Sequence, residues 1–540
     1  MCGLLTYFGG EKKDLTNLAD NLTSRGPDDQ ASLHIDNSSF YFSRLSIIGQ
    51  GEGGSQPIQD SSGITLTCNG EIYNYKNLID KFKLKTTTAS DCEVILLLYK
   101  KLGLQETLNL LDGVFFFTLY DPRKKELFAA RDPFGVRPGF IGCDAKDGVF
   151  ISSEVKAIPE SVTNISSFNP GCWWSSEKQT FKRYFDNNFS SINVRSEELI
   201  LSDIRESLVE AVEKRLMSER EIGCLLSGGL DSSLIAALVC KMNDGYRLRD
   251  NVWRREFEPS AKKIKTFSIG MSDSPDLKYA KEVADFIGSD HYTVQLSQQD
   301  FLEAIPEVVY KIESYDTTTV RASVGNYLVS KFIKDNTNCK VIFNGDGSDE
   351  VCCGYVYNIN APNPDELHKE SKRLLDEIHY FDVLRSDRSI SSNGLEPRTP
   401  FLDKEFVNIY MSIDPALKTF DKKNKIEKHL LRKAFSKDHI LPDSVLWRHK
   451  CAFSDGVSDS KTSWHNIIKE HVDKKLSDEE FCSELSEIDH CKPLLKESLY
   501  YRQIFNETYS HCQNIIPHFW MPKWTDVIDP SARELSLYKE

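Results

Sequence analysis

Two stretches of this 540-residue chain combine residue types that could do chemistry, and they lie far apart in the sequence. The first is Cys2, directly after Met1, and the second is residues 227–233, which read SGGLDSS. A cysteine thiol becomes a nucleophile once a base removes its proton. A glycine- and serine-rich loop before a helix can bind an anion through its backbone N–H groups and the positive end of the helix dipole. The chain therefore offers a thiol nucleophile and an anion-binding loop.

Cys2 would need a base, and the first 290 residues contain one histidine, His34. The second candidate is the α-amine of Cys2 itself, which removal of Met1 would expose, because an α-amine has an ordinary pKa of about 7.7–8.0. The small size of residue 2 favours that removal. A third interpretation is that Cys2 is a small buried residue at the start of a strand, which is the commoner fate of cysteine. These three interpretations stay open on the residues alone.

Other polar residues in this region fit a pocket for an amino acid. Arg44 could clamp an α-carboxylate, and Asp91, at the start of a helix predicted over residues 90–103, could hold an α-ammonium. Asn69 and Gly70 place a side-chain amide beside a backbone N–H, and such a pair could form an oxyanion hole. Taken singly, Asp91 is better explained as a helix-start residue and Asn69-Gly70 as a turn. Only together do they describe a pocket.

The SGGLDSS loop follows a strand predicted over residues 222–226 and precedes a helix. It lacks the lysine of the GxxxxGK[ST] pattern, so it is not a Walker A loop; its glycines could also be structural. A second string, NGDGSDE at residues 344–350, follows a strand predicted over residues 340–344. The carboxyl ends of parallel strands are where ligands bind in such sheets, and carboxylate oxygens suit Mg²⁺. A solvated turn explains the same composition.

The pattern of elements predicts two domains of different texture. Up to about residue 185 it favours a layered α+β domain with antiparallel sheet, with hairpins over 114–121/126–132 and 140–144/148–153. Residues 25–28, RGPD, are predicted as a polar turn, and residues 184–196 as a linker. Strands over 222–226, 265–271, 292–296 and 340–344 then alternate with helices, which predicts a parallel sheet. Beyond about residue 355 the pattern is mainly helical.

Composition excludes several classes of protein. The net charge of −14 gives no general positive field for nucleic acid. Fourteen cysteines, scattered without a CxxC pair, fit neither a disulfide scaffold nor a zinc ribbon. No run of 18 apolar residues and no basic leader segment are visible, so we expect no membrane partner and a cytoplasmic location.

Strings along nearly the full length resemble the glutamine-hydrolysing asparagine synthetase family of class II glutamine amidotransferases, and its bacterial B type in particular. They are MCG, RGPD, RLSI, NGEIYN, SDCEVI, RDPFG, SSEVKAI, LLSGGLDSS, SPDLKYAKEVA, ESYDTTTVRAS, GDGSDE, LEPRTPFLD, EKHLLRKAF and WRHKCAFSDGV. The resemblance implies an α+β N-terminal-nucleophile (Ntn) hydrolase domain of layered antiparallel sheets at residues 1–187. It also implies an α/β ATP-pyrophosphatase-like domain, with a parallel sheet and a helical C-terminal part, at residues 197–540.

The resemblance further implies an activity. The first domain would free ammonia from glutamine, and the second would adenylate aspartate with ATP. Ammonia would then cross a tunnel and displace AMP, giving asparagine, glutamate, AMP and pyrophosphate. Family members are often homodimers. An amidotransferase of the same build with another acceptor carboxylate, and an inactive relative kept as a scaffold, are the two alternatives.

Roles carried over from matching motifs cover both domains. Cys2 would be the nucleophile, with Asn69 and Gly70 as its oxyanion hole. Glutamine would be held by Arg44, Leu45, Ser46, Ile47, Ile48, Asn69, Gly70, Glu71 and Asp91. ATP would be bound by Leu226, Ser227, Gly228, Gly229, Asp231, Ser232, Ser233, Ile269, Asn344 and Gly345. Asp231 and Asp349 would hold Mg²⁺, Lys450 would neutralise phosphate charge, and Asp382 and Arg385 match polar positions of the synthetase centre.

The acidic loop departs from the family pattern. The family usually has SGEGSDE where this chain has NGDGSDE, so Asn344 replaces a serine and Asp346 replaces a glutamate used around formation of the aspartyl-AMP. Asp346 is one methylene shorter, and a reach shorter by about 1 Å matters where catalytic placement is tight. The alternative is that Asp346 only caps its turn. The usual FGG after the loop is Cys352-Cys353-Gly354 here.

Overall fold

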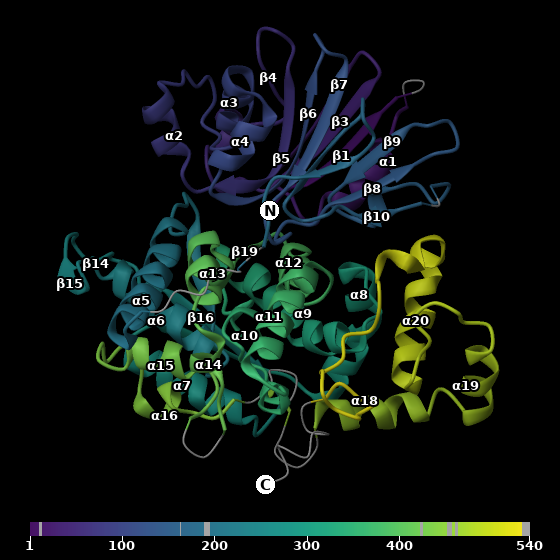
Figure 1. The fold of residues 1–540 in the computed structure, drawn as a ribbon. Coiled ribbons are helices and arrows are strands. Elements are labelled where there is room, and N and C mark those ends of the chain that lie inside the picture. The colour runs from purple at the N-terminus through teal and green to yellow at the C-terminus, as the bar shows by residue number, and fades with distance from the viewer. Residues whose placement is uncertain are drawn as a thin grey trace.

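The structure, a computed structural model, describes residues 1–9, 13–162, 164–187, 189, 195–421, 425–450, 456–458 and 463–531. The described residues of the N-terminal part (1–187) and of the C-terminal part (197–531) lie one above the other in Figure 1, with the N-terminus at their junction. Among the described residues, no helix combines the length and apolar character needed to cross a bilayer.

The N-terminal part is built on two six-stranded antiparallel sheets. Their strand orders are β10-β8-β9-β1-β3-β2 and β12-β11-β7-β6-β5-β4. The strands are β1 (Gly3–Phe8), β2 (Asp29–Ile35), β3 (Ser38–Arg44), β4 (Ile58–Gln59), β5 (Thr65–Ile72), β6 (Gly113–Asp121), β7 (Glu126–Arg131), β8 (Phe140–Cys143), β9 (Val149–Ser152), β10 (Ser166–Ser167), β11 (Cys172–Ser175) and β12 (Phe181–Arg183). Both predicted hairpins are confirmed as β6–β7 and β8–β9.

Apolar side chains pack between these two sheets because alternate residues of each strand point inward. Leu4 and Phe40 from one sheet and Phe116 from the other belong to the same buried cluster. A second cluster joins the outer face of β5–β7 to helices α2 (Tyr75–Phe82), α3 (Glu93–Leu102) and α4 (Leu104–Leu110). The layered α+β prediction is therefore confirmed, and α3 confirms the predicted helix near residues 90–103.

The C-terminal part contains a five-stranded parallel sheet in the order β17-β16-β13-β18-β19. Its strands are β13 (Glu221–Leu225), β16 (Lys265–Gly270), β17 (Asp290–Gln295), β18 (Cys339–Phe343) and β19 (Glu396–Arg398). The helices are α5 (Glu197–Lys214), α6 (Leu230–Asn243), α7 (Pro275–Ile287), α8 (Gln298–Ile312), α9 (Thr317–Asn336), α10 (Ser348–Val351), α11 (Pro364–Glu377), α12 (Asp382–Ser391), α13 (Lys404–Met411), α14 (Pro415–Lys418), α15 (His429–Phe435), α16 (Asp443–Leu446), α18 (Trp464–Asp473), α19 (Asp478–Leu485) and α20 (Lys496–Tyr509). The parallel sheet and the helical C-terminal region are as predicted.

Three features differ from the sequence prediction. Strand β19 is a fifth parallel strand inside the region predicted as mainly helical. An antiparallel hairpin of β14 (Tyr246–Arg249) and β15 (Val252–Arg255) lies between α6 and β16. Asn69 and Gly70 lie in the middle of β5, paired with β6, so their interpretation as a turn is wrong.

Candidate active sites

Cys2 precedes β1, and hydrogen bonds fix both its backbone N–H and its backbone carbonyl. Its backbone N–H donates to Asn69 Oδ1 over 3.0 Å, and its carbonyl oxygen accepts from Arg25 Nε over 3.0 Å. The thiol Sγ lies 3.9 Å from the Leu45 carbonyl oxygen. Burial raises the pKa of the thiol, while the positive charge of the N-terminal amine lowers it. The main chain around Cys2 is thus fixed, and rotation about χ1 is left to aim the thiol.

The two base candidates differ in position. His34 lies on β2, where Nδ1 hydrogen-bonds Ser39 Oγ over 2.9 Å. Within the described residues no histidine hydrogen-bonds Cys2. The N-terminal amine, carried by Met1 in this structure, lies 3.3 Å from Glu396 Oε2. His34 is thus hydrogen-bonded within its own hairpin, whereas the Cys2 nitrogen, which becomes the amine once Met1 is removed, belongs to the same residue as the thiol.

Asn69 has an unused donor next to Cys2. Its Oδ1 accepts from the Cys2 N–H, whereas its buried Nδ2 has no hydrogen-bond partner among the described residues. An unpaired buried donor costs about 1–3 kcal/mol, so its retention beside a thiol indicates a group that arrives with the substrate. This is the arrangement expected of an oxyanion-hole donor.

Arg44 ends β3 and is buried. Its guanidinium donates to the carbonyl oxygens of Gly51 (2.6 Å), Ile48 (3.2 Å) and Gly49. These hydrogen bonds fold the 48–51 loop around the guanidinium. The sequence predicts that Arg44 binds the substrate carboxylate directly. In this structure its two terminal nitrogens instead bind the loop that borders the pocket.

The remaining glutamine-pocket residues come from neighbouring segments. The Ser46 N–H donates to Asp28 Oδ2 over 2.8 Å, and the Ile47 carbonyl accepts from the Glu219 N–H over 3.0 Å. Asp91 Oδ2 accepts from the Ile72 N–H over 2.6 Å, just before α3. Burial raises the pKa of Asp91 to about 6.

Glu71 is a buried carboxylate with an unused oxygen. Burial, together with the nearby Glu396 and Asp91 carboxylates, raises its pKa well above the ordinary value. Within the described part of the chain its Oε2 accepts no hydrogen bond, and Arg398 Nη2 lies 3.9 Å away as an ion-pair partner. Both Glu396 and Arg398 belong to β19, so the C-terminal part contributes charge to the pocket around Cys2.

The C-terminal part encloses a cavity of about 250 Å³ at the carboxyl ends of β13, β16 and β18. It is lined by thirteen of the predicted residues, namely Leu226, Ser227, Gly229, Asp231, Ser232, Ile269, Asn344, Gly345, Asp346, Asp349, Asp382, Arg385 and Lys450. Gly228 and Ser233 of the predicted loop do not line it; Ser233 is fully buried in the first turn of α6.

The SGGLDSS loop and the acidic loop pack against each other. Ser232 Oγ accepts from the Ser227 N–H over 3.1 Å and lies 2.9 Å from Ser227 Oγ, which closes the first loop. Gly345 passes so near that a Cβ there would lie 2.7 Å from the Ser232 nitrogen. The N-terminal turn of α6 thus faces the cavity beside the acidic loop.

Lys428 joins the two predicted metal ligands, and sequence reasoning missed it. Its Nζ lies 2.6 Å from Asp231 Oδ2 and 2.5 Å from Asp349 Oδ1, and Lys450 Nζ pairs with the other oxygen of Asp349. Burial alone would raise the pKa of Asp349, but the two ammonium groups hold it below its ordinary value. Two cations and two carboxylates therefore meet at one end of the cavity.

Asp346 faces α12. Its Oδ1 accepts from Arg385 Nη2 over 2.9 Å, and the same nitrogen lies 3.0 Å from Asp382 Oδ1. Burial raises the pKa of Asp346, and Arg385 partly offsets that effect. Asn344 Oδ1 accepts from the Asp346 N–H over 3.3 Å. Asp346 therefore does more than cap a turn, since its side chain reaches across to another element.

Tyr355, which the sequence did not single out, joins two carboxylates that it did, Glu350 of the acidic loop and Asp382. Tyr355 Oη donates to Glu350 Oε1 over 2.5 Å and lies 3.3 Å from Asp382 Oδ2. Burial and the neighbouring carboxylates raise the pKa of Glu350 well above its ordinary value. Arg321 of α9 also lines the cavity and is paired with Glu497.

Comparison with known proteins agrees with this division of chemistry. The asparagine synthase family model matches residues 203–363 and 359–528, and the glutamine amidotransferase domain model matches residues 1–207. "Asparagine synthetase [glutamine-hydrolyzing]" of Gallus gallus is 40% identical over 575 residues, covering 100% of this chain and 99% of that protein. The Homo sapiens protein of the same name is 39% identical over 573 residues with the same coverage. The chain belongs to the asparagine synthase family.

Among solved structures, the glutamine phosphoribosylpyrophosphate amidotransferase of B. subtilis covers 55% of this chain and 91% of its own, at 17% identity and a TM-score of 0.32.

This asparagine synthase family member has Cys352 and Cys353 where the family usually has other residues, and the structure shows how both fit. Cys353, where the family usually has glycine, has a φ of 55°, the left-handed region that glycine adopts most easily. Cys352 and Cys353 are both buried, which fits their interpretation as small packing residues.

Proposed function

We propose that this chain synthesises L-asparagine from L-aspartate and ATP, with ammonia released from glutamine, through a β-aspartyl-AMP intermediate. Glutamate, AMP and pyrophosphate are the other products. The observation that carries the proposal is a cavity in which the SGGLDSS loop and the acidic loop meet two lysines. The same chain holds the Cys2 thiol beside Asn69, whose Nδ2 donates to none of the described residues. Residues 1–187 would be the glutaminase domain and residues 197–540 the synthetase domain.

In the glutaminase domain, Cys2 would be the nucleophile after Met1 is removed. The Cys2 amine would take the thiol proton, and the sulfur would attack the side-chain carbonyl carbon of glutamine. Asn69 Nδ2 and the Gly70 N–H would stabilise the oxyanion. The proton would then pass to the departing ammonia, and water would hydrolyse the remaining thioester to glutamate.

Charged groups around Cys2 would hold the rest of glutamine. Glu71 and Asp91 would bind the α-ammonium group. Glu71 Oε2 supports this, because it accepts no hydrogen bond from the described residues. Arg44 would help to bind the α-carboxylate by holding the 48–51 loop in place beside it. The segment from Leu45 to Ile48 would form the wall beside the thiol.

In the synthetase domain, the β-carboxylate of aspartate would attack the α-phosphorus of ATP, and pyrophosphate would leave. The nucleotide would be bound by the cavity-lining residues Leu226, Ser227, Gly229, Asp231, Ser232, Ile269, Asn344 and Gly345. Gly228 and Ser233 would complete the loop without lining the cavity. Lys450 and Lys428 would neutralise phosphate charge as it shifts to the leaving group. Ammonia would then attack the acyl carbon, and AMP would leave.

Asp231 and Asp349 would hold Mg²⁺. Their carboxylates converge on one Lys428 ammonium, so they could converge equally on a cation. Among the described residues no group of three or more His, Cys, Asp or Glu side chains forms a metal site, and Mg²⁺ commonly uses one or two carboxylates together with substrate phosphates. When bound, the ion would neutralise charge on the pyrophosphate.

A cytoplasmic location and a homodimer complete the proposal. The location rests on the composition and pattern of the sequence, the dimer rests on the family resemblance, and no nucleic acid or membrane partner is proposed. Incubation with glutamine, aspartate, ATP and Mg²⁺, with all products quantified, tests the activity. We expect equal amounts of asparagine, AMP and pyrophosphate. Amidation of a different carboxylate in a parallel acceptor screen, or release of ADP and phosphate, would contradict it.

A further inference from the structure

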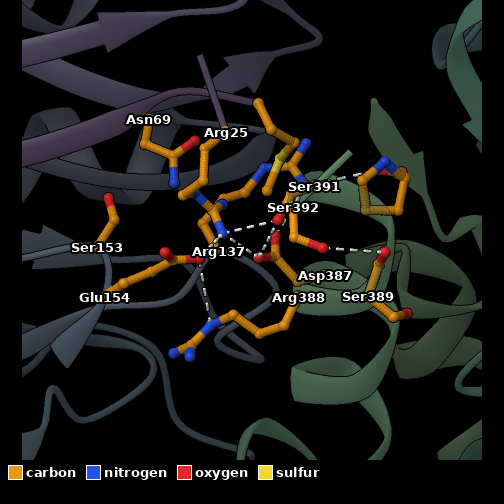
Figure 2. A network of polar contacts seen from close by, with 12 residues as sticks. Arg25, Asn69, Arg137, Ser153, Glu154, Asp387, Arg388, Ser389, Ser391 and Ser392 are labelled. Carbon is orange, nitrogen blue, oxygen red and sulfur yellow. Dashed lines mark hydrogen bonds and ion pairs between the residues drawn. The ribbon is translucent and has the colours of Figure 1, made fainter. Parts of the chain in front are cut away.

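Arg25 connects Cys2 to the C-terminal part of the chain. The residue is completely buried, and its Nε donates to the Cys2 carbonyl oxygen over 3.0 Å. Its Nη1 lies 2.8 Å from Glu154 Oε1 in the N-terminal part, and also 2.8 Å from Asp387 Oδ1 and Ser391 Oγ on helix α12. Figure 2 shows Arg25 between Glu154 on one side and Asp387 with Ser391 on the other. The guanidinium thus bridges the two parts.

Glu154 alone cannot balance this guanidinium, because other cations share it. Lys156 Nζ lies 2.6 Å from Glu154 Oε2, and Arg388 Nε lies 3.9 Å from Glu154 Oε1. Together with Arg25, these cations hold the pKa of Glu154 at about 2 against the effect of its burial. Asp387 supplies the second negative charge that Arg25 requires.

The orientation of Arg25 bears on the nucleophile. The Cys2 N–H is fixed by Asn69, and the Cys2 carbonyl oxygen by Arg25. Both ends of the Cys2 main chain must stay in place for the Cα–Cβ bond to keep its direction. A displacement of about 1 Å at a reacting atom can cost of order 10²-fold in rate.

We propose that Asp387, on a helix of the synthetase domain, is a positioning residue for the glutaminase: it holds the Arg25 guanidinium in the orientation that fixes the Cys2 carbonyl. The inference rests on the proposed role of Cys2 as nucleophile. Asp387 acts through Arg25, and the two side chains lie 362 residues apart in sequence. The glutaminase site is therefore completed by the C-terminal part of the chain.

Three variants on the full-length enzyme test the inference. Asp387→Asn keeps the side-chain shape and removes the charge, Asp387→Glu restores the charge, and Ser389→Ala alters another buried residue of α12. Ser389 Oγ donates to the Arg385 carbonyl within the helix, so this control leaves the Arg25 contacts intact. Glutamine hydrolysis and ammonia-dependent synthesis are measured for each.

We expect Asp387→Asn to lower kcat for glutamine hydrolysis by about 10- to 100-fold, with ammonia-dependent synthesis within about twofold of wild type. Asp387→Glu should regain part of the loss, and Ser389→Ala should match wild type. In a double-mutant cycle, Asp387→Asn should have little further effect in an Arg25→Lys background, because both changes break the same link.

Each opposite result overturns the inference. Wild-type glutaminase kcat in Asp387→Asn would show that Arg25 needs no help from α12. Equal loss of both activities, or failure of both Asp387 variants to fold, would make Asp387 structural. Additive effects in the cycle would show that Asp387 does not act through Arg25. Cys2→Ala separates this from the proposed function: glutamine hydrolysis that persists in that variant would remove Cys2 itself.

Discussion

The Asn344 side-chain amide donates to Ser386 Oγ over 2.7 Å, which ties the loop after β18 to helix α12. On the same two elements, Asp346 Oδ1 accepts from Arg385 Nη2 over 2.9 Å. The two departures of this chain from the family loop, Asn344 and Asp346, therefore both contact α12. The loop and the helix are therefore joined at both departures, including the shorter Asp side chain.

Asp346→Glu should reduce asparagine synthesis, because the longer side chain would move the carboxylate away from its present position 2.9 Å from Arg385 Nη2. Asp346→Ala should lose synthesis by about 10²-fold while glutamine hydrolysis continues. Rates of pyrophosphate release and of glutamate formation check both variants. Synthesis that rises in Asp346→Glu would show instead that the shorter side chain is a handicap.

Cys2→Ala should abolish glutamine-dependent synthesis and leave ammonia-dependent synthesis unchanged, because free ammonia bypasses the first site. Protein in which mass spectrometry shows Met1 retained should behave similarly, since the peptide bond removes the proposed base. Asparagine formation from each nitrogen donor is the measurement. Full glutamine-dependent activity with Met1 in place would refute the amine mechanism.

Arg44→Lys should raise the KM for glutamine and leave the ammonia reaction unaltered, because lysine lacks the planar group that binds the carbonyls of the 48–51 loop. Gly54→Ala should have a similar effect, since a Cβ there would lie 2.1 Å from Arg44 Nη2. Gly53→Ala is the control, because its Cβ would meet Ala89 at an ordinary 3.7 Å. An unchanged KM in both Arg44→Lys and Gly54→Ala would show that the 48–51 loop does not take part in glutamine binding.

Lys428→Met should suppress pyrophosphate release and lower the free energy of unfolding by about 3 kcal/mol, because it leaves Asp231 and Asp349 without their shared cation. Glutamine hydrolysis should continue. Lys433→Met, in helix α15, which begins directly after Lys428, is the control: its pair with Glu197 is solvent-exposed and should contribute about 0–1 kcal/mol. Product assays and urea unfolding distinguish them, and equal behaviour of the two variants would dismiss Lys428.

Asp91 predicts a pH dependence of stability in the absence of glutamine. Because its pKa is raised to about 6 in the folded protein, the folded state binds more protons than the unfolded state between roughly pH 4 and 6. The Asp91 contribution to stability is therefore present at low pH and is lost as pH rises through about 6. Asp91→Asn keeps an acceptor for the Ile72 N–H and should remove this part of the decline. Urea unfolding at pH 4.5 and 7.5 measures it, and an equal decline in the variant would contradict the assignment.

Elements with a local signal were predictable from the sequence. The hairpin β6–β7 alternates apolar residues around a PRKK turn, and α5 carries Leu208 and Val212 on one helical face, so period and turn composition sufficed. Strand β19 has three residues, one of them Pro397, and forms because β18 offers it an edge. Nothing within so short a segment indicates pairing.

Site residues with distant partners could not be predicted in the same way. Lys428 is 197 residues from Asp231, and its own surroundings form a helix start with no local motif of chemistry. Arg25 was predicted in a polar turn because RGPD has that composition, yet it is completely buried by partners 129 and 362 residues away. The packing of two domains, which the sequence does not encode locally, gives these side chains their roles.

The buried charges around Arg25 limit which halves of related proteins could be recombined. A glutaminase domain joined to a foreign partner would keep Glu154 for Arg25, but it would bury Arg137 without either of its two carboxylates, Asp387 and Glu396. Burying an unpaired guanidinium destabilises a protein strongly, so such a hybrid would fold poorly even with its linker intact. Exchange of domains between relatives should succeed where the incoming domain supplies the residue that pairs with Arg25, as Asp387 does here. The contacting surfaces of the two domains must then be exchanged together. Cutting and rejoining chains at the linker predicted over residues 184–196 would separate them.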